Sequence, residues 1–244
     1  MKRVFADLHL CANINDASQV SRLTSKASML EYRLVALPFP LRVPEQQLKQ
    51  VQRVCEGMGI GFASRVDLKP RAPEELLKFL RTLRRRFEVI AVMCESKAVA
   101  RQAAKDRRVD LLNFPQPDFR RAFFDGAEAE LASTCLASLE IDLRPLLALE
   151  GVARVRLLSV LRREVQTAKE FHVPIVVSSG VSEELLMRKP MELAALTSLF
   201  GLDRVSATDA VSKNPVAIVR RNTEKLSWQF VAPGIRIIRR GKDC

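Results

Sequence analysis

The chain has 244 residues, of which 48% are hydrophobic and 28% are charged, and its 40 Lys and Arg exceed its 28 Asp and Glu to give a formal charge of +12. This apolar content is enough for a large core, and 9 Gly and 12 Pro are too few for a mainly disordered chain. Long apolar stretches, an N-terminal signal sequence and CxxC cysteine pairs are all missing. We therefore expect a cytoplasmic protein with no membrane association or disulfide framework, and the positive charge favours a polyanionic partner such as nucleic acid.

Short apolar runs alternate with helical periodicity along the whole chain. Eight runs are predicted to be strands, over residues 4–8, 34–37, 61–66, 89–93, 109–114, 137–141, 175–178 and 205–208. Between them, apolar side chains recur every three or four residues, as on the buried face of a helix. These helical repeats lie around residues 48–58, 76–87, 152–161, 193–200 and 216–226.

The ends of the predicted helices carry suitable residues. Pro73 is placed to begin one helix, and the Asn214-Pro215 pair is expected to be an N-cap followed by proline at the first helical position. Gly59 and Gly201 lie where helices are expected to stop. Eight strand and helix pairs in about 240 residues predict an α/β fold, a (β/α)₈ TIM-type barrel, although an open doubly wound sheet gives the same alternation. We expect one domain over residues 1–235, with a basic tail over residues 236–244.

Polar residues follow the predicted strands, at the end of a barrel where active sites lie. Asp7 and His9 alternate at the end of the first strand and therefore point the same way, and Asp142 and Asp209 end later strands. Together these four residues are a candidate metal site. The chain has only one other histidine, His172, which is expected at the opposite rim, so the alternative is a structural hydrogen-bonding role for Asp7 and His9.

Two loops and several basic clusters are candidates for binding phosphate. The Ser178-Ser179-Gly180 turn and the Asn214-Pro215 pair follow the last two predicted strands, where barrels often bind phosphate, although ordinary loop and cap chemistry explains them equally well. Arginine and lysine recur on the predicted helices around residues 78–86 and 101–108, which suggests a continuous positive surface. With one Trp and one Tyr, phosphate contact is favoured over base stacking.

Three segments resemble a known family. The opening VFADLHL, the VDLLNFP segment from Val109 and the long segment IVVSSGVSEELLMRKPMELAALTSLFGL from Ile175 are similar to the barrel-forming protein subunit of archaeal and eukaryotic ribonuclease P. That family is related in fold to the phosphoesterases named after polymerase and histidinol phosphatase (PHP-like). The resemblance covers nearly the whole chain.

The resemblance implies an accessory subunit of an RNA-based enzyme that removes the 5′ leader from precursor tRNA. Catalysis would belong to the RNA with its Mg²⁺, and the protein itself would bind no cofactor. The implied partners are the ribonuclease P RNA, precursor tRNA in the holoenzyme and a small α/β protein subunit. Matching positions suggest Ser179, Arg188, Lys213 and Asn214 as RNA contacts, and charge reasoning adds Arg108 and Arg120.

The alternative is a metal-dependent phosphoesterase that uses Asp7, His9, Asp142 and Asp209 at the barrel mouth. The related phosphoesterases begin with a D-x-H-x-H metal motif, whereas this chain has Cys11 at the position of the second histidine. This departure favours the noncatalytic subunit.

Overall fold

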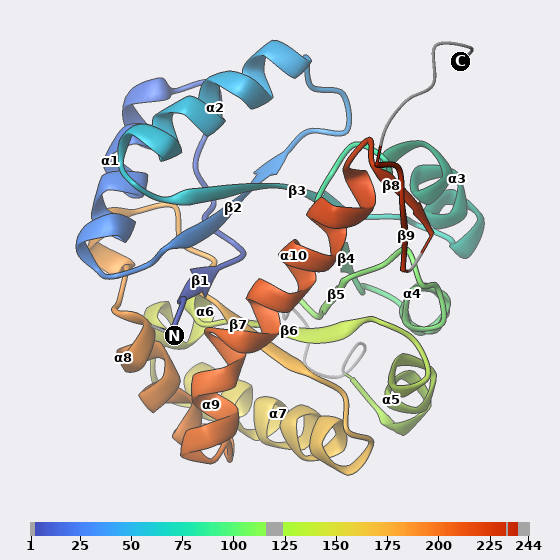
Figure 1. The fold of residues 1–244 in the computed structure, drawn as a ribbon. Coiled ribbons are helices and arrows are strands. Elements are labelled where there is room, and N and C mark those ends of the chain that lie inside the picture. The colour runs from blue at the N-terminus through green and yellow to red at the C-terminus, as the bar shows by residue number, and fades with distance from the viewer. Residues whose placement is uncertain (1–2, 116–123, 233, 239–244) are drawn as a thin grey trace.

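A computed structural model of the protein describes residues 3–115, 124–232 and 234–238 (Figure 1). Within these residues, seven parallel strands form one sheet in sequence order, which confirms the expected TIM-type α/β fold. The strands are β1 (Ala6–Asp7), β2 (Leu34–Phe39), β3 (Gly61–Leu68), β4 (Val89–Met93), β5 (Leu111–Asn113), β6 (Ser138–Asp142) and β7 (Ile175–Ser178).

Helices surround this sheet, and the last of them lies across one end of the barrel. They are α1 (Ala17–Met29), α2 (Glu45–Gly57), α3 (Pro73–Leu83), α4 (Lys97–Ala104), α5 (Gly126–Ser133), α6 (Arg144–Ala148), α7 (Gly151–Glu170), α8 (Pro190–Leu196), α9 (Arg204–Ala210) and α10 (Lys213–Leu226). A short hairpin of β8 (Phe230–Ala232) and β9 (Ile235–Arg236) follows α10. None of the described helices is both long and apolar enough to span a bilayer.

The prediction of an eighth strand over residues 205–208 is wrong, because these residues belong to α9. The Asp203 side chain caps this helix by accepting hydrogen bonds from the backbone N–H groups of Val205 and Ser206, both at 3.0 Å. The carbonyl of Val211 instead accepts a hydrogen bond from Ala6 N at 3.0 Å, and a bridge between Leu10 and Val181 joins the ends of β1 and β7. The barrel is thus nearly closed by seven strands.

Helix α10 closes the amino-terminal end of the barrel, which faces the viewer in Figure 1. Its Ile218 and Val219 pack against the small interior side chains of the strands, such as Ala36, Ala63 and Ala91. Polar side chains of the same helix bind the backbone where the strands begin.

Two hydrogen bonds of α10 illustrate this attachment. Asn214 Nδ2 donates to Ile175 O at the start of β7, and Asn222 Nδ2 donates to Glu88 O just before β4, at 2.8 and 2.7 Å. With this end closed, a deep opening remains at the carboxyl ends of the strands.

Most of the predicted helix ends are confirmed. Pro73 begins α3, and Gly59 and Gly201 follow helices with φ angles of +69° and +94° that glycine adopts readily. The prediction for Asn214-Pro215 is wrong by two residues, because α10 begins at Lys213 with Ser212 as its N-cap residue.

Candidate functional site

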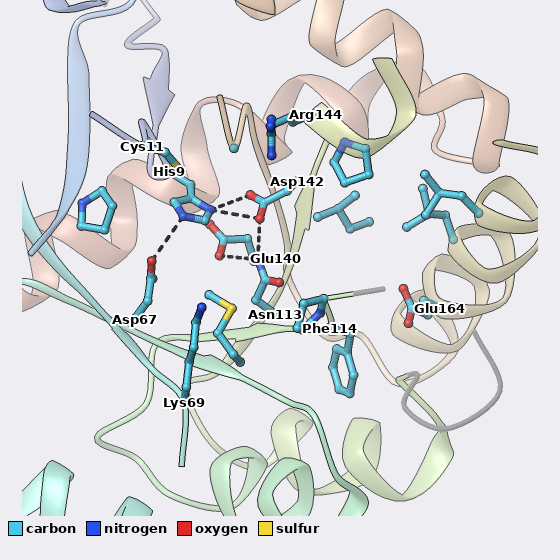
Figure 2. Close-up of a pocket in the computed structure, with 18 residues that line it drawn as sticks. His9, Cys11, Asp67, Lys69, Asn113, Phe114, Glu140, Asp142, Arg144 and Glu164 are labelled. Carbon is cyan, nitrogen blue, oxygen red and sulfur yellow. Dashed lines mark hydrogen bonds and ion pairs between the residues drawn. The ribbon is translucent and has the colours of Figure 1, made fainter. Parts of the chain in front are cut away.

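A cavity of about 460 Å³ opens at the carboxyl ends of the strands, the position predicted for a site. Figure 2 shows its polar lining, with His9 between the carboxylates of Asp67 and Asp142. The polar and charged residues that line this barrel mouth are His9, Asp67, Lys69, Asn113, Glu140, Asp142, Arg144 and Glu164.

A fully buried arginine lies beneath this cavity. Arg65 is in the middle of β3, and its two terminal nitrogens donate to the two carboxylate oxygens of Glu140 at 2.6 and 2.7 Å. Its Nε donates to Asp67 Oδ1 at 2.7 Å, and Nη1 also donates to Leu8 O at 2.8 Å. Burial opposes the charge, but the carboxylates of Asp67 and Glu140 raise the pKa of Arg65 well above its usual range.

The carboxylate of Glu140 has further donors. Ser178 Oγ donates to its Oε1 at 2.8 Å, and Asn113 Nδ2 donates to its Oε2 at 3.1 Å. The same Asn113 nitrogen donates to Asp142 Oδ2 at 2.8 Å. Both Glu140 oxygens are therefore fully engaged inside the barrel.

His9 lies between two carboxylates of the barrel mouth, those of Asp67 and Asp142. Its Nδ1 lies 2.9 Å from Asp142 Oδ1, and its Nε2 lies 3.3 Å from Asp67 Oδ2. Burial and the Arg65 charge oppose protonation, but Asp142 and Asp67 outweigh them and raise the pKa of His9 well above its usual range. A carboxylate beside each ring nitrogen thus favours the protonated form of the ring.

Asp7 has a structural role beside this network. Its Oδ1 accepts hydrogen bonds from the backbone N–H groups of Ser179 and His9, at 3.0 and 3.1 Å, which joins the ends of β7 and β1. Its Oδ2 is buried without a hydrogen-bond partner among the described residues. Burial raises the pKa of this carboxyl group above its usual range.

The residues of the barrel mouth do not fit a metal ion. In the described part of the chain, His9, Glu140 and Asp142 place potential ligand atoms within 4.8 Å of one another. However, Arg65 donates to both oxygens of Glu140 and so occupies the carboxylate that lies deepest in this group. A divalent cation would also meet the positive charge of the buried guanidinium.

Asp209, the fourth residue of the candidate metal site, does not lie at the barrel mouth. It belongs to α9, lies 3.9 Å from both Arg3 and Lys213, and lines a separate cavity near the start of β7. Its predicted position was wrong because it depended on the eighth strand.

Arg65 and Glu140 were missed by the sequence analysis. Both lie within apolar strands, where each is two residues before an acidic side chain, Asp67 or Asp142, on the same face of its strand. That spacing is the available signal, since an arginine in a continuous apolar run is expected to need an internal carboxylate.

The residues suggested as RNA contacts are scattered. Ser179 is buried, and its hydroxyl and N–H contact His9 and Asp7. Arg188 donates to the carbonyls of Leu185 and Met187.

The other suggested contacts lie at the opposite end of the barrel. Lys213 is exposed, Asn214 binds the start of β7, and Arg108 forms a two-point ion pair with Asp106 at 2.6 and 2.9 Å. Arg120 lies outside the described residues. The structure does not gather these residues into one site.

Comparison with known proteins identifies relatives over the whole chain. The model of the family described as RNase P subunit p30 matches residues 4–227. "Ribonuclease P protein component 3" from Methanosarcina mazei is 30% identical over 99% of this chain and 98% of its own length, and the protein of that name from Methanosarcina barkeri is 32% identical over 98% of each chain. Among solved structures, a chain of an archaeal ribonuclease P with mature tRNA, determined by cryo-EM, has a similar fold. It has a TM-score of 0.83 at 20% identity and covers 97% of this chain and 99% of its own.

Proposed function

Because the chain belongs to the RNase P subunit p30 family, we propose that it is a noncatalytic protein subunit of ribonuclease P. In this proposal it binds and stabilises the catalytic RNA, which removes the 5′ leader from precursor tRNA with the help of Mg²⁺. Its other partners are precursor tRNA in the holoenzyme and a small α/β protein subunit. The names of the archaeal relatives support this assignment.

The observation that carries RNA binding is a basic face on two neighbouring helices. Helices α3 and α4 pack together, and each exposes cations toward solvent. This basic face consists of Lys78, Arg81 and Arg85 from α3 and the turn after it, and Arg101 and Lys105 from α4 and its C-cap. Such a surface attracts the phosphate backbone of a folded RNA and lowers the repulsion between its strands.

The barrel mouth supports the noncatalytic part of the proposal. Arg65 and His9 form direct ion pairs with the carboxylates of Glu140, Asp67 and Asp142. A metal-dependent hydrolase needs such carboxylates to be available to its metal. We therefore assign the polar network a structural role.

Single-turnover cleavage of a precursor tRNA at low Mg²⁺ tests the proposal. The reaction contains the cognate catalytic RNA and the small protein subunit, with or without this protein, and a parallel reaction contains this protein alone. We expect the protein to accelerate cleavage only when the RNA is present. No acceleration, or cleavage by the protein alone, would contradict the proposed function.

A further inference from the structure

A groove at the amino-terminal end of the barrel brings together cations from three distant segments. It encloses about 160 Å³ between the turn after α3, the turn after α4 and the C-terminal end of α10. Figure 1 shows this end of α10 on the same side of the barrel as α3 and α4. The lining residues are Arg84, Arg85, Arg107, Arg108, Asn222, Lys225 and Leu226.

Two of these arginines are held in place by the fold. Arg84 donates to Asp110 Oδ2 at 2.5 Å and to three backbone carbonyls, including Phe87 O at 2.8 Å. Arg108 forms the two-point ion pair with Asp106. Their backbones and side chains therefore give the groove a fixed floor.

The other three cations are available for a ligand. Arg85, Arg107 and Lys225 are exposed, and none of them forms an ion pair with another described residue. Burial, together with the charges of Arg221 and Arg84, lowers the pKa of Lys225 from its usual value, while Asp110 opposes this effect. An anion in the groove would relieve this repulsion between like charges.

We propose that this groove binds backbone phosphates of RNA. The inference rests on the proposed function and assigns it a specific site. RNA is favoured over a small free anion because the groove continues into the basic face of α3 and α4, so that successive phosphates of one strand would meet successive cations. Arginine is suited to this contact, since its planar group forms two-point hydrogen bonds with phosphate.

The test compares two charge-matched triple variants. The groove variant carries Arg85→Gln, Arg107→Gln and Lys225→Gln. The control variant carries Arg33→Gln, Arg53→Gln and Arg156→Gln, three exposed positions outside the groove that also form no ion pair with another described residue. Both variants lose three positive charges, and thermal unfolding checks that both fold.

Equilibrium binding is measured over a range of salt concentrations, with the catalytic RNA alone and with precursor tRNA alone. Each lost phosphate contact reduces the slope of log Kd against log salt by about 0.7–0.9. We therefore expect the groove variant to reduce this slope by about 2 for one of the two RNAs, with at least a tenfold higher Kd at low salt than the control variant. The RNA that responds identifies the source of the phosphates.

A third variant keeps the three positive charges of the groove but exchanges arginine and lysine at these positions. Arg85→Lys, Arg107→Lys and Lys225→Arg should retain most of the affinity. The single tryptophan, Trp228, is three residues beyond Lys225, so its fluorescence gives an independent signal of RNA near the groove. If the wild-type protein binds RNA and the groove variant behaves like the control, the groove assignment is overturned while the proposed function stands. If the wild-type protein binds neither RNA, the proposed function itself fails.

Discussion

Arg65 determines the charge balance inside the barrel. Its guanidinium is fully buried and holds Glu140 in a two-point ion pair, while its Nε holds Asp67. A buried ion pair contributes little compared with a well-packed apolar pair, but removing one partner leaves an uncompensated charge. The free energy of unfolding should therefore depend on whether Arg65 and Glu140 are both present.

Arg65→Met should lower the free energy of unfolding by about 3–5 kcal/mol, because Glu140 then remains buried without its cation. The double variant Arg65→Met with Glu140→Met should recover part of this loss, since Asp67 still lacks its ion pair with Arg65. Urea denaturation of the wild type, both single variants and the double variant measures the coupling. Additive losses in the double variant would contradict this role for Arg65.

His9 should make the free energy of unfolding depend on pH above about pH 6.5. Its pKa is raised in the folded state, so its contribution is fully present below the unfolded value of about 6.5 and is lost as the pH rises through the folded pKa. The pKa values of Asp67 and Asp142 are lowered by Arg65 and His9, so their contribution is present above about pH 3.9 and is lost as the pH falls.

We therefore expect the wild-type free energy of unfolding to decrease above pH 6.5, and His9→Gln to flatten this decrease. Urea denaturation between pH 6 and 9 measures both slopes, and Asn13→Gln, an exposed change on the same segment, is the control. Equal slopes for wild type and His9→Gln would show that the ring is neutral in the folded protein.

At the scale of elements, α10 closes the amino-terminal end of the seven-stranded barrel. It packs apolar side chains into the barrel and binds the starts of β4 and β7 through Asn222 and Asn214. The helix also contributes Lys225 to the proposed groove. One element thus closes the barrel and contributes to the surface proposed to bind RNA.

Ile218→Ala should lower the free energy of unfolding by about 2–5 kcal/mol, since Ile218 is buried in the barrel interior and its removal leaves a cavity. Arg220→Ala, on the exposed face of the same helix, should change it by no more than about 0.5 kcal/mol. Thermal or urea unfolding distinguishes the two. Similar effects of both changes would mean that α10 does not close the barrel by apolar packing.

The sequence predicted the seven strands well because each buried strand of a parallel sheet is a short continuous apolar run. Residues 205–208 (Val-Ser-Ala-Thr) contain β-branched residues but are only half apolar, Asp203 caps a helix there and Val205 is 71% exposed. Periodicity alone does not separate such a run from a short helix. Asp209 was misplaced for the same reason, whereas Asp142 ends β6, His9 follows β1, and both lie at the barrel mouth as predicted.

On the scale of the whole molecule, the two ends of the barrel differ in the sign and the pairing of their charged side chains. At the carboxyl end, the carboxylates of Asp67, Glu140 and Asp142 form ion pairs with Arg65 or His9. At the amino end, cations of the groove and of the neighbouring basic face point to solvent. The formal charge of +12 therefore acts mainly through the outer surface, where under the proposed function it would attract RNA over long distances at low salt.

The most direct measurement is the Mg²⁺ concentration that gives half-maximal single-turnover cleavage of precursor tRNA by the reconstituted holoenzyme. It is determined with the wild-type protein, with the groove variant and with Asp142→Asn, which removes a carboxylate from the barrel mouth while the fold is monitored by circular dichroism. We predict that the groove variant raises this Mg²⁺ requirement several-fold and that Asp142→Asn leaves it unchanged. A normal requirement with the groove variant, together with loss of cleavage in Asp142→Asn, would contradict the account and place the function at the barrel mouth.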